Sequence, residues 1–259
     1  MKRCIVILLV ILGATNAFSQ IRFDKLEIEA RQTYFIERSD ILVVDTLVMR
    51  DSSRIVLNRE RKENIINVKV LLVTGNAQIV GHGANGIKGK LGINGLRQGA
   101  PCRAGGNASE GGSGGKGIPG TSLSLYTNQL VIIGTLTIDL NGGNGGAGGD
   151  GGNGGDGGGG TRVCRGGNGG AGGRGGNGGD GGNGGNLTIT CRECESLYVM
   201  QGHQLFIKNY GGYGGVGATG GNGGQAGLGS KQDGRNGSRG LPGVNGVAGK
   251  PGTTRFEKK

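Results

Sequence analysis

The stretch from Gly142 to Gly185 reads GGNGGAGGDGGNGGDGGGG, then TRVCR, then GGNGGAGGRGGNGGDGGNGG. Side chains recur in it at every third position. A helix with 3.6 residues per turn and a strand with alternating faces both lack this period, whereas polyproline II geometry has three residues per turn and no internal hydrogen bonds. Two bare glycine positions per triplet let neighbouring chains approach and pair their backbone groups. We therefore expect a bundle of such helices.

The same triplet pattern occurs in two further segments. Three out-and-back hairpins are predicted, in 81–121, 141–186 and 211–254, and together they make six glycine-rich runs. The first and sixth runs carry mostly one glycine per triplet, so we place them at the edges of the bundle. Three other readings compete. They are a disordered low-complexity segment, a collagen triple helix, which 4 prolines against 65 glycines disfavour, and a calcium-binding repeat, whose apolar position is here Gly152.

The segments between the hairpins are rich in short β-prone runs. Leu, Ile and Val dominate 21–80, 122–140 and 187–210, which polar turns interrupt. Repeated short strands of similar spacing favour a parallel β-helix, with a β-sandwich as the alternative base. The predicted fold class is therefore an all-β solenoid base with three inserted hairpins of glycine-rich polyproline II-type helices, a six-helix bundle.

The N-terminus has the pattern of a bacterial secretory signal peptide. Lys2 and Arg3 precede an apolar stretch that is too short to span a bilayer, and small residues follow it. We place the signal peptide at 1–17, with cleavage as late as residue 20. The expected location is secreted or at the cell surface, and no transmembrane segment is expected after signal removal.

Four cysteines follow the signal segment, an even number that suits an oxidising compartment. Cys102 and Cys164 fall in the turns of the first two hairpins, so a disulfide between these turns is predicted. Cys191 and Cys194 form CREC, for which a local disulfide is favoured over redox chemistry. No metal site is expected, because zinc would need a second ligand pair and the two histidines lack ligand spacing. No cofactor is expected.

Positive charge gathers at the predicted turns. Lys and Arg number 29 against 18 Asp and Glu, and without Lys2 and Arg3 the formal charge is about +9. Such a basic surface would attract anionic polysaccharide or lipopolysaccharide phosphate. Nucleic acid is a weaker candidate, since no turn contains an aromatic residue for base stacking. The candidate ligand-binding residues are Arg97, Arg103, Arg162, Arg165, Lys231 and Arg235.

No catalytic residues are expected. Many β-helix proteins cleave polysaccharides, but the sequence shows no paired carboxylates on a strand face and no histidine with a partner. We therefore expect a protein that is not an enzyme.

The glycine triplets, the count of six runs and the cysteines at turns resemble the snow flea antifreeze proteins and the glycine-rich tips of some phage tail-fibre adhesins. The strand-rich part resembles secreted bacterial β-helix proteins of the cell surface. These resemblances imply either ice binding or adhesion through end loops. Asp150, Arg174 and Asp180 place charges at exposed triplet positions, which suits ice poorly. A structural or adhesion role ranks first, ice binding second and polysaccharide cleavage last.

Overall fold

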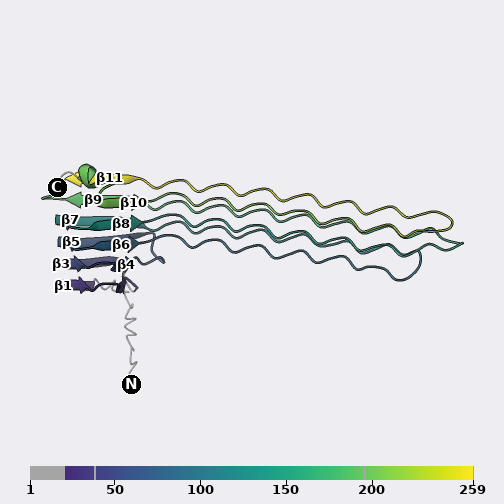
Figure 1. Ribbon diagram of the computed structural model, residues 1–259, viewed down its shortest axis with the longest axis horizontal. Coiled ribbons are helices and arrows are strands. Elements are labelled where there is room, and N and C mark those ends of the chain that lie inside the picture. Colours follow the sequence, from purple (N-terminus) through teal and green to yellow (C-terminus); the bar gives the residue numbers. More distant parts are fainter. Residues whose placement is uncertain (1–20, 38, 195–196, 259) are drawn as a thin grey trace, which may run out of the picture.

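The computed structural model describes residues 21–37, 39–194 and 197–258. The predicted signal peptide at 1–17 lies outside the described residues. The chain forms a block of β-sheet from which a long, thin shaft of glycine-rich segments extends, with the chain crossing the shaft out and back (Figure 1).

Almost all regular secondary structure is parallel β-sheet. The chain winds alternately through two sheets, in the orders β1-β3-β5-β7-β9-β11 and β10-β8-β6-β4-β2. The strands are β1 (Ile21–Ile28), β2 (Thr33–Phe35), β3 (Ile41–Met49), β4 (Arg54–Val56), β5 (Glu63–Val73), β6 (Asn76–Val80), β7 (Ser122–Ile132), β8 (Thr135–Asp139), β9 (Leu187–Cys191), β10 (Leu205–Lys208) and β11 (Thr254–Lys258).

Apolar side chains fill the space between the two sheets. Leu42, Ile66, Leu125 and Ile189 stand in register on four neighbouring strands, and each is fully buried. Because strands in parallel register place like side chains beside one another, these residues form a continuous aliphatic row. Burying each such side chain contributes about 1.5–3 kcal/mol to the free energy of unfolding.

The prediction of a six-helix glycine bundle inserted in a β-helix is wrong. The described residues form two sheets with 11 strands, and their one helix is the four-residue α1 (Leu197–Met200). The same finding overturns the polyproline II, polyglycine II and collagen-like descriptions of the glycine runs. The backbone hydrogen bonds of the glycine runs join one run to another. The glycines recur at these positions because another backbone lies too close there for a Cβ atom.

Six extended runs make up the shaft. Each outgoing run leaves an even-numbered strand, and each returning run enters an odd-numbered one, so the two layers of the shaft continue the two sheets (Figure 1). Hydrogen bonds cross both within and between the layers, for example Gly149 N–H to Gly112 O at 2.9 Å and Gly148 N–H to Val216 O at 2.9 Å. We name the runs 1 (83–98), 2 (105–121), 3 (141–160), 4 (166–186), 5 (210–229) and 6 (232–253).

Two elements differ from the sequence expectation for the base. The segment after Cys194 was expected to be strand, but Leu197–Met200 is helical, with Leu197 and Met200 buried against the core. The tail Thr254–Lys258 was not expected to pair, yet it forms β11 beside β9. Its sequence, TRFEK, has little apolar character, so the pairing depends on backbone groups that the open edge of β9 offers.

Candidate functional site

The predicted binding residues lie at the three turns of the shaft. All three turns are at the end of the shaft far from the sheets (Figure 1), and the side chains of all six residues are exposed. Arg97 Nε lies 3.3 Å from Asp156 Oδ2. Within the described ranges, the other five form no ion pair with the protein, which leaves their charges facing solvent: Arg103, Arg162, Arg165, Lys231 and Arg235.

Covalent and backbone bonds hold the turns to one another. A disulfide joins Cys102 of the first turn to Cys164 of the second, with Cα atoms 6.0 Å apart. This disulfide is compatible with the expected pairing. Gly160 N–H donates to Leu228 O at 2.7 Å and links the second turn to the third. The basic side chains therefore project from one connected end surface, which we call the tip.

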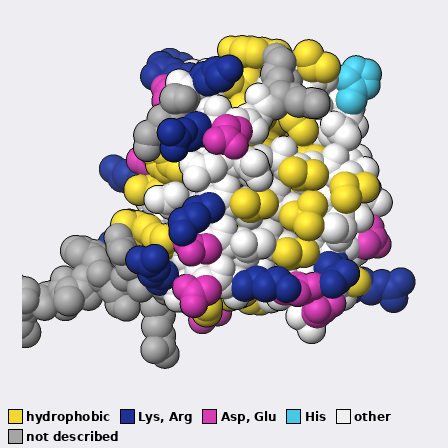
Figure 2. Space-filling view, turned by 90° about the vertical axis from the view of Figure 1, so that its left-hand side faces the viewer, with side chains coloured by type: hydrophobic (Ala, Val, Ile, Leu, Met, Phe, Trp, Pro, Cys, Tyr) yellow, Lys and Arg dark blue, Asp and Glu magenta, His cyan; other side chains and the backbone are white. Residues whose placement is uncertain are grey.

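The opposite end of the molecule has a different charge pattern. Basic and acidic side chains are interspersed on the end face of the sheets (Figure 2). Ion pairs within the sheets include Lys25 with Glu27, Arg50 with Glu27 and Lys69 with Asp45. The charges of these pairs largely cancel, whereas those of the tip largely do not.

A row of Asn and Asp side chains binds neighbouring runs together, a role that the sequence reading missed. Their side-chain oxygens accept hydrogen bonds from backbone N–H groups of the adjacent run, as Asn144 Oδ1 does from Tyr213 N–H at 2.9 Å. Thr219 donates to Asp150 Oδ1 through its hydroxyl at 2.7 Å and its N–H at 3.0 Å, which lowers the pKa of Asp150 below its ordinary value. The recurrence of Asn and Asp at third positions was the signal available in the sequence.

A groove lies where the shaft leaves the sheets. It has a volume of about 450 Å³ and is lined by the end of β8 and the first residues of runs 1, 3 and 5. Its lining includes His82, Asp139, Tyr210 and Tyr213. His82 Nδ1 lies 3.9 Å from Asp139 Oδ2. Neither tyrosine was singled out from the sequence as a groove residue, because the two are brought to His82 only by the pairing of runs.

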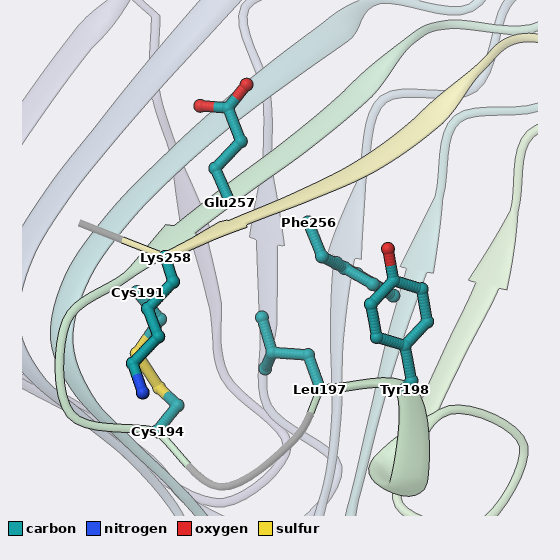
Figure 3. Close-up of a pocket in the computed structure, with 7 residues that line it drawn as sticks. All are labelled: Cys191, Cys194, Leu197, Tyr198, Phe256, Glu257 and Lys258. Carbon is teal, nitrogen blue, oxygen red and sulfur yellow. A yellow bond between two sulfur atoms is a disulfide. The ribbon is translucent and has the colours of Figure 1, made fainter.

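A smaller pocket of about 310 Å³ is lined by residues of β9, α1 and β11 and by Cys194 (Figure 3). Tyr198 and Phe256 form an edge-to-face pair there with ring centroids 4.9 Å apart. The disulfide Cys191–Cys194 forms the other side and is compatible with the local pairing expected for CREC. Figure 3 shows Glu257 directed away from the pocket. The pocket therefore presents two rings, the disulfide and the Lys258 side chain, which lies beside the disulfide (Figure 3).

Among the described residues, no cluster of three or more His, Cys, Asp or Glu is placed to hold a metal ion. No helix in the described part of the chain is long and apolar enough to cross a membrane.

Comparisons with known proteins add little. No protein-family model matches the chain, and no curated protein matches it. Among solved structures, it is similar to the springtail antifreeze protein from Granisotoma rainieri, described as a nine polyproline type II helical bundle. Identity is 27%, and the match covers 60% of this chain and 93% of that one with a TM-score of 0.09. A TM-score this low carries no argument about fold or function.

Proposed function

We propose that this is an exported structural or adhesion protein that presents basic loops at the end of a glycine-rich shaft to an anionic polysaccharide or lipopolysaccharide. The observation that supports the proposal is the placement of three basic turns at one end of the shaft, the first two of which are joined by the disulfide Cys102–Cys164. Turns on a stiff scaffold tolerate variation and present side chains, whereas glycine offers no side-chain chemistry. No catalytic role is assigned.

The base and the shaft have separate roles in this proposal. Burial of aliphatic side chains between the sheets anchors the strands from which every run departs. Inter-run hydrogen bonds then hold the shaft extended, so that the tip stands away from the base. A surface held away from the body of the protein can reach a polymer on another surface, and its exposed charges attract that polymer over about one Debye length.

The test changes the six tip residues to serine: Arg97, Arg103, Arg162, Arg165, Lys231 and Arg235. Retention on immobilised polygalacturonate and lipopolysaccharide should fall at least tenfold. A matched control removes six exposed charges from the base: Arg22, Arg54, Lys62, Arg192, Lys208 and Lys258. That variant has the same formal charge and should keep its retention. Equal losses of retention in the two variants would show that retention depends on net charge alone. That result would contradict a site at the tip.

Salt gives an independent measurement on the unaltered protein. The Debye length is about 8 Å at 0.15 M and about 3 Å at 1 M ionic strength. Attraction between exposed charges should therefore be lost over this range. Retention that persists at 1 M salt would contradict an electrostatic tip site.

A further inference from the structure

The groove at the root of the shaft combines aromatic and polar groups on one surface. Tyr210 and Tyr213 stand on run 5, with 66% and 79% of their surface exposed. Across from them the groove is lined by Asn85 and Asn144, and by Asp139 at the end of β8. Its volume of about 450 Å³ falls within the range of sites for small ligands.

The two tyrosines are fixed at the backbone although their rings are exposed. Tyr210 N–H donates to Asn141 Oδ1 at 2.8 Å, and Tyr210 O accepts from Gly142 N–H at 2.8 Å. Tyr213 has the same two bonds, to Asn144 Oδ1 at 2.9 Å and from Gly145 N–H at 2.8 Å. The backbone at both positions is therefore ordered before a ligand binds, and only the exposed side chains lose conformational freedom on binding.

Glycines line the groove together with both tyrosines. Gly211 and Gly212 separate the tyrosines, and Gly142 lies beside them in the groove lining. Because glycine has no side chain, a flat molecule can approach the ring faces and the backbone without steric conflict. Three residues of extended chain span roughly 10 Å, which is comparable to the length of a disaccharide.

The polar groups of the groove are oriented by bonds they already make. Asn85 Oδ1 accepts from Asn144 N–H at 2.8 Å, and Asn144 Oδ1 accepts from Tyr213 N–H. Each amide oxygen is thus engaged, and within the described residues neither amide nitrogen has a protein acceptor. The nitrogens can donate to a ligand. Asp139 Oδ1 accepts from Asn141 N–H at 3.1 Å, and its Oδ2 can accept from a ligand hydroxyl.

We infer that this groove binds a short segment of a neutral glycan. The apolar faces of sugar rings stack on exposed phenol rings, and sugar hydroxyls pair with amide donors and a carboxylate acceptor. The charged groups in the lining are Asp139 and, when protonated, His82, beside which Arg59 Nη2 lies 3.5 Å from Nε2. A carboxylate within the groove disfavours a polyanion, so the site differs in ligand chemistry from the basic tip.

The experiment measures binding of the full exported chain to β-1,4-glucan, β-1,4-linked N-acetylglucosamine and α-mannan oligosaccharides by saturation-transfer NMR. Tyr210→Ala and Tyr213→Ala should each weaken binding at least tenfold. Tyr213→Phe, which keeps the ring, should stay within about threefold of the unaltered protein. Tyr126→Ala is the control, because it removes an exposed tyrosine on β7 that does not line the groove.

Several results would overturn the inference. One is failure of the unaltered protein to bind any of the three glycans. Another is unchanged binding by both tyrosine-to-alanine variants, provided circular dichroism shows the fold intact. Binding that vanishes at 1 M salt would instead indicate a charged site. The six-serine tip variant should still bind these glycans, so failure of the groove and failure of the tip can be told apart.

Discussion

Asn153 accepts a hydrogen bond through its side-chain Oδ1 from the backbone N–H of Asn222, which lies 69 residues later in the chain, at 2.8 Å. The bond joins run 3 to run 5, and the same arrangement recurs along the shaft. Gly154 N–H donates to Asn222 O at 2.8 Å one step further on. A side chain and a backbone group therefore secure a triplet of this kind together. The other Asn and Asp residues of runs 3 and 4 that accept in this way are Asn141, Asn144, Asp150, Asp156, Asn168, Asn177, Asp180, Asn183 and Asn186.

Replacing a glycine of the inner runs should destabilise the shaft. A Cβ at Gly172 would overlap the backbone carbonyl of Gly221, so Gly172→Ala must push runs 4 and 5 apart. We expect a cost of about 1–3 kcal/mol, measured by thermal unfolding, together with faster proteolysis of the shaft. Gly99→Ala is the control, because no atom lies within 4 Å of a Cβ built there. Equal stability of the two variants would contradict close packing of the runs.

Acid should weaken the contact between runs 3 and 5. Hydrogen bonds from Thr219 hold the pKa of Asp150 below its ordinary value. A carboxyl group whose pKa is lower in the folded state stabilises that state fully above its unfolded pKa, about 3.9. This stabilisation is lost as the pH falls through the folded pKa. Urea unfolding at pH 7 and at pH 2–3 should show a smaller acid-induced loss for Asp150→Asn than for the unaltered protein.

A second carboxyl group gives an independent test of the same effect. The N–H of Val247 lowers the pKa of Asp180 in run 4. Asp180→Asn should therefore reduce the acid sensitivity in the same direction as Asp150→Asn. An acid response that is the same in both variants as in the unaltered protein would mean that these hydrogen bonds contribute nothing to it.

Removing the Cys102–Cys164 disulfide should loosen the tip more than removing Cys191–Cys194 loosens the base. The two disulfides span sequence separations of 62 and 3. On chain entropy alone, these correspond to about 4 and about 2 kcal/mol. Double serine variants, compared by thermal unfolding and by hydrogen exchange at the turns, would measure the difference. Peptide mapping without reduction should recover the two linked pairs, and free thiols at Cys102 and Cys164 would contradict the pairing.

Ice-recrystallisation inhibition should be absent or weak. Ice binding requires a flat array of small side chains, but the outward row of run 5 carries Tyr213 with 79% and Leu228 with 77% of their surface exposed. Asp150 adds a charge to the adjacent row of run 3. Activity at micromolar protein that survives Tyr213→Ala would contradict the ranking of adhesion above ice binding.

The sequence separates strand-rich from glycine-rich segments. The helices that it predicts for the glycine-rich segments are wrong. The third-position recurrence that includes Gly143, Gly146 and Gly149 predicts a helix, and that prediction is wrong. In the structure these glycines are places where another backbone passes too closely for a Cβ. The tip residues were identified from local turns. Tyr210 and Tyr213 were not placed beside Asp139, because nothing local relates residues about 70 positions apart.

The sequence by itself determined where the glycine runs begin and end and which residues sit at the turns, because glycine spacing and turn composition are local properties. Only the tertiary structure decided which run lies beside which. A glycine run has no side chains to bury and satisfies its backbone by pairing with other runs, such as run 3 with runs 1, 2, 4 and 5. The order of those partners follows from the order of strands in the two parallel sheets, whose buried aliphatic rows set the register. The joined tip and the groove at the root exist only once that order is established.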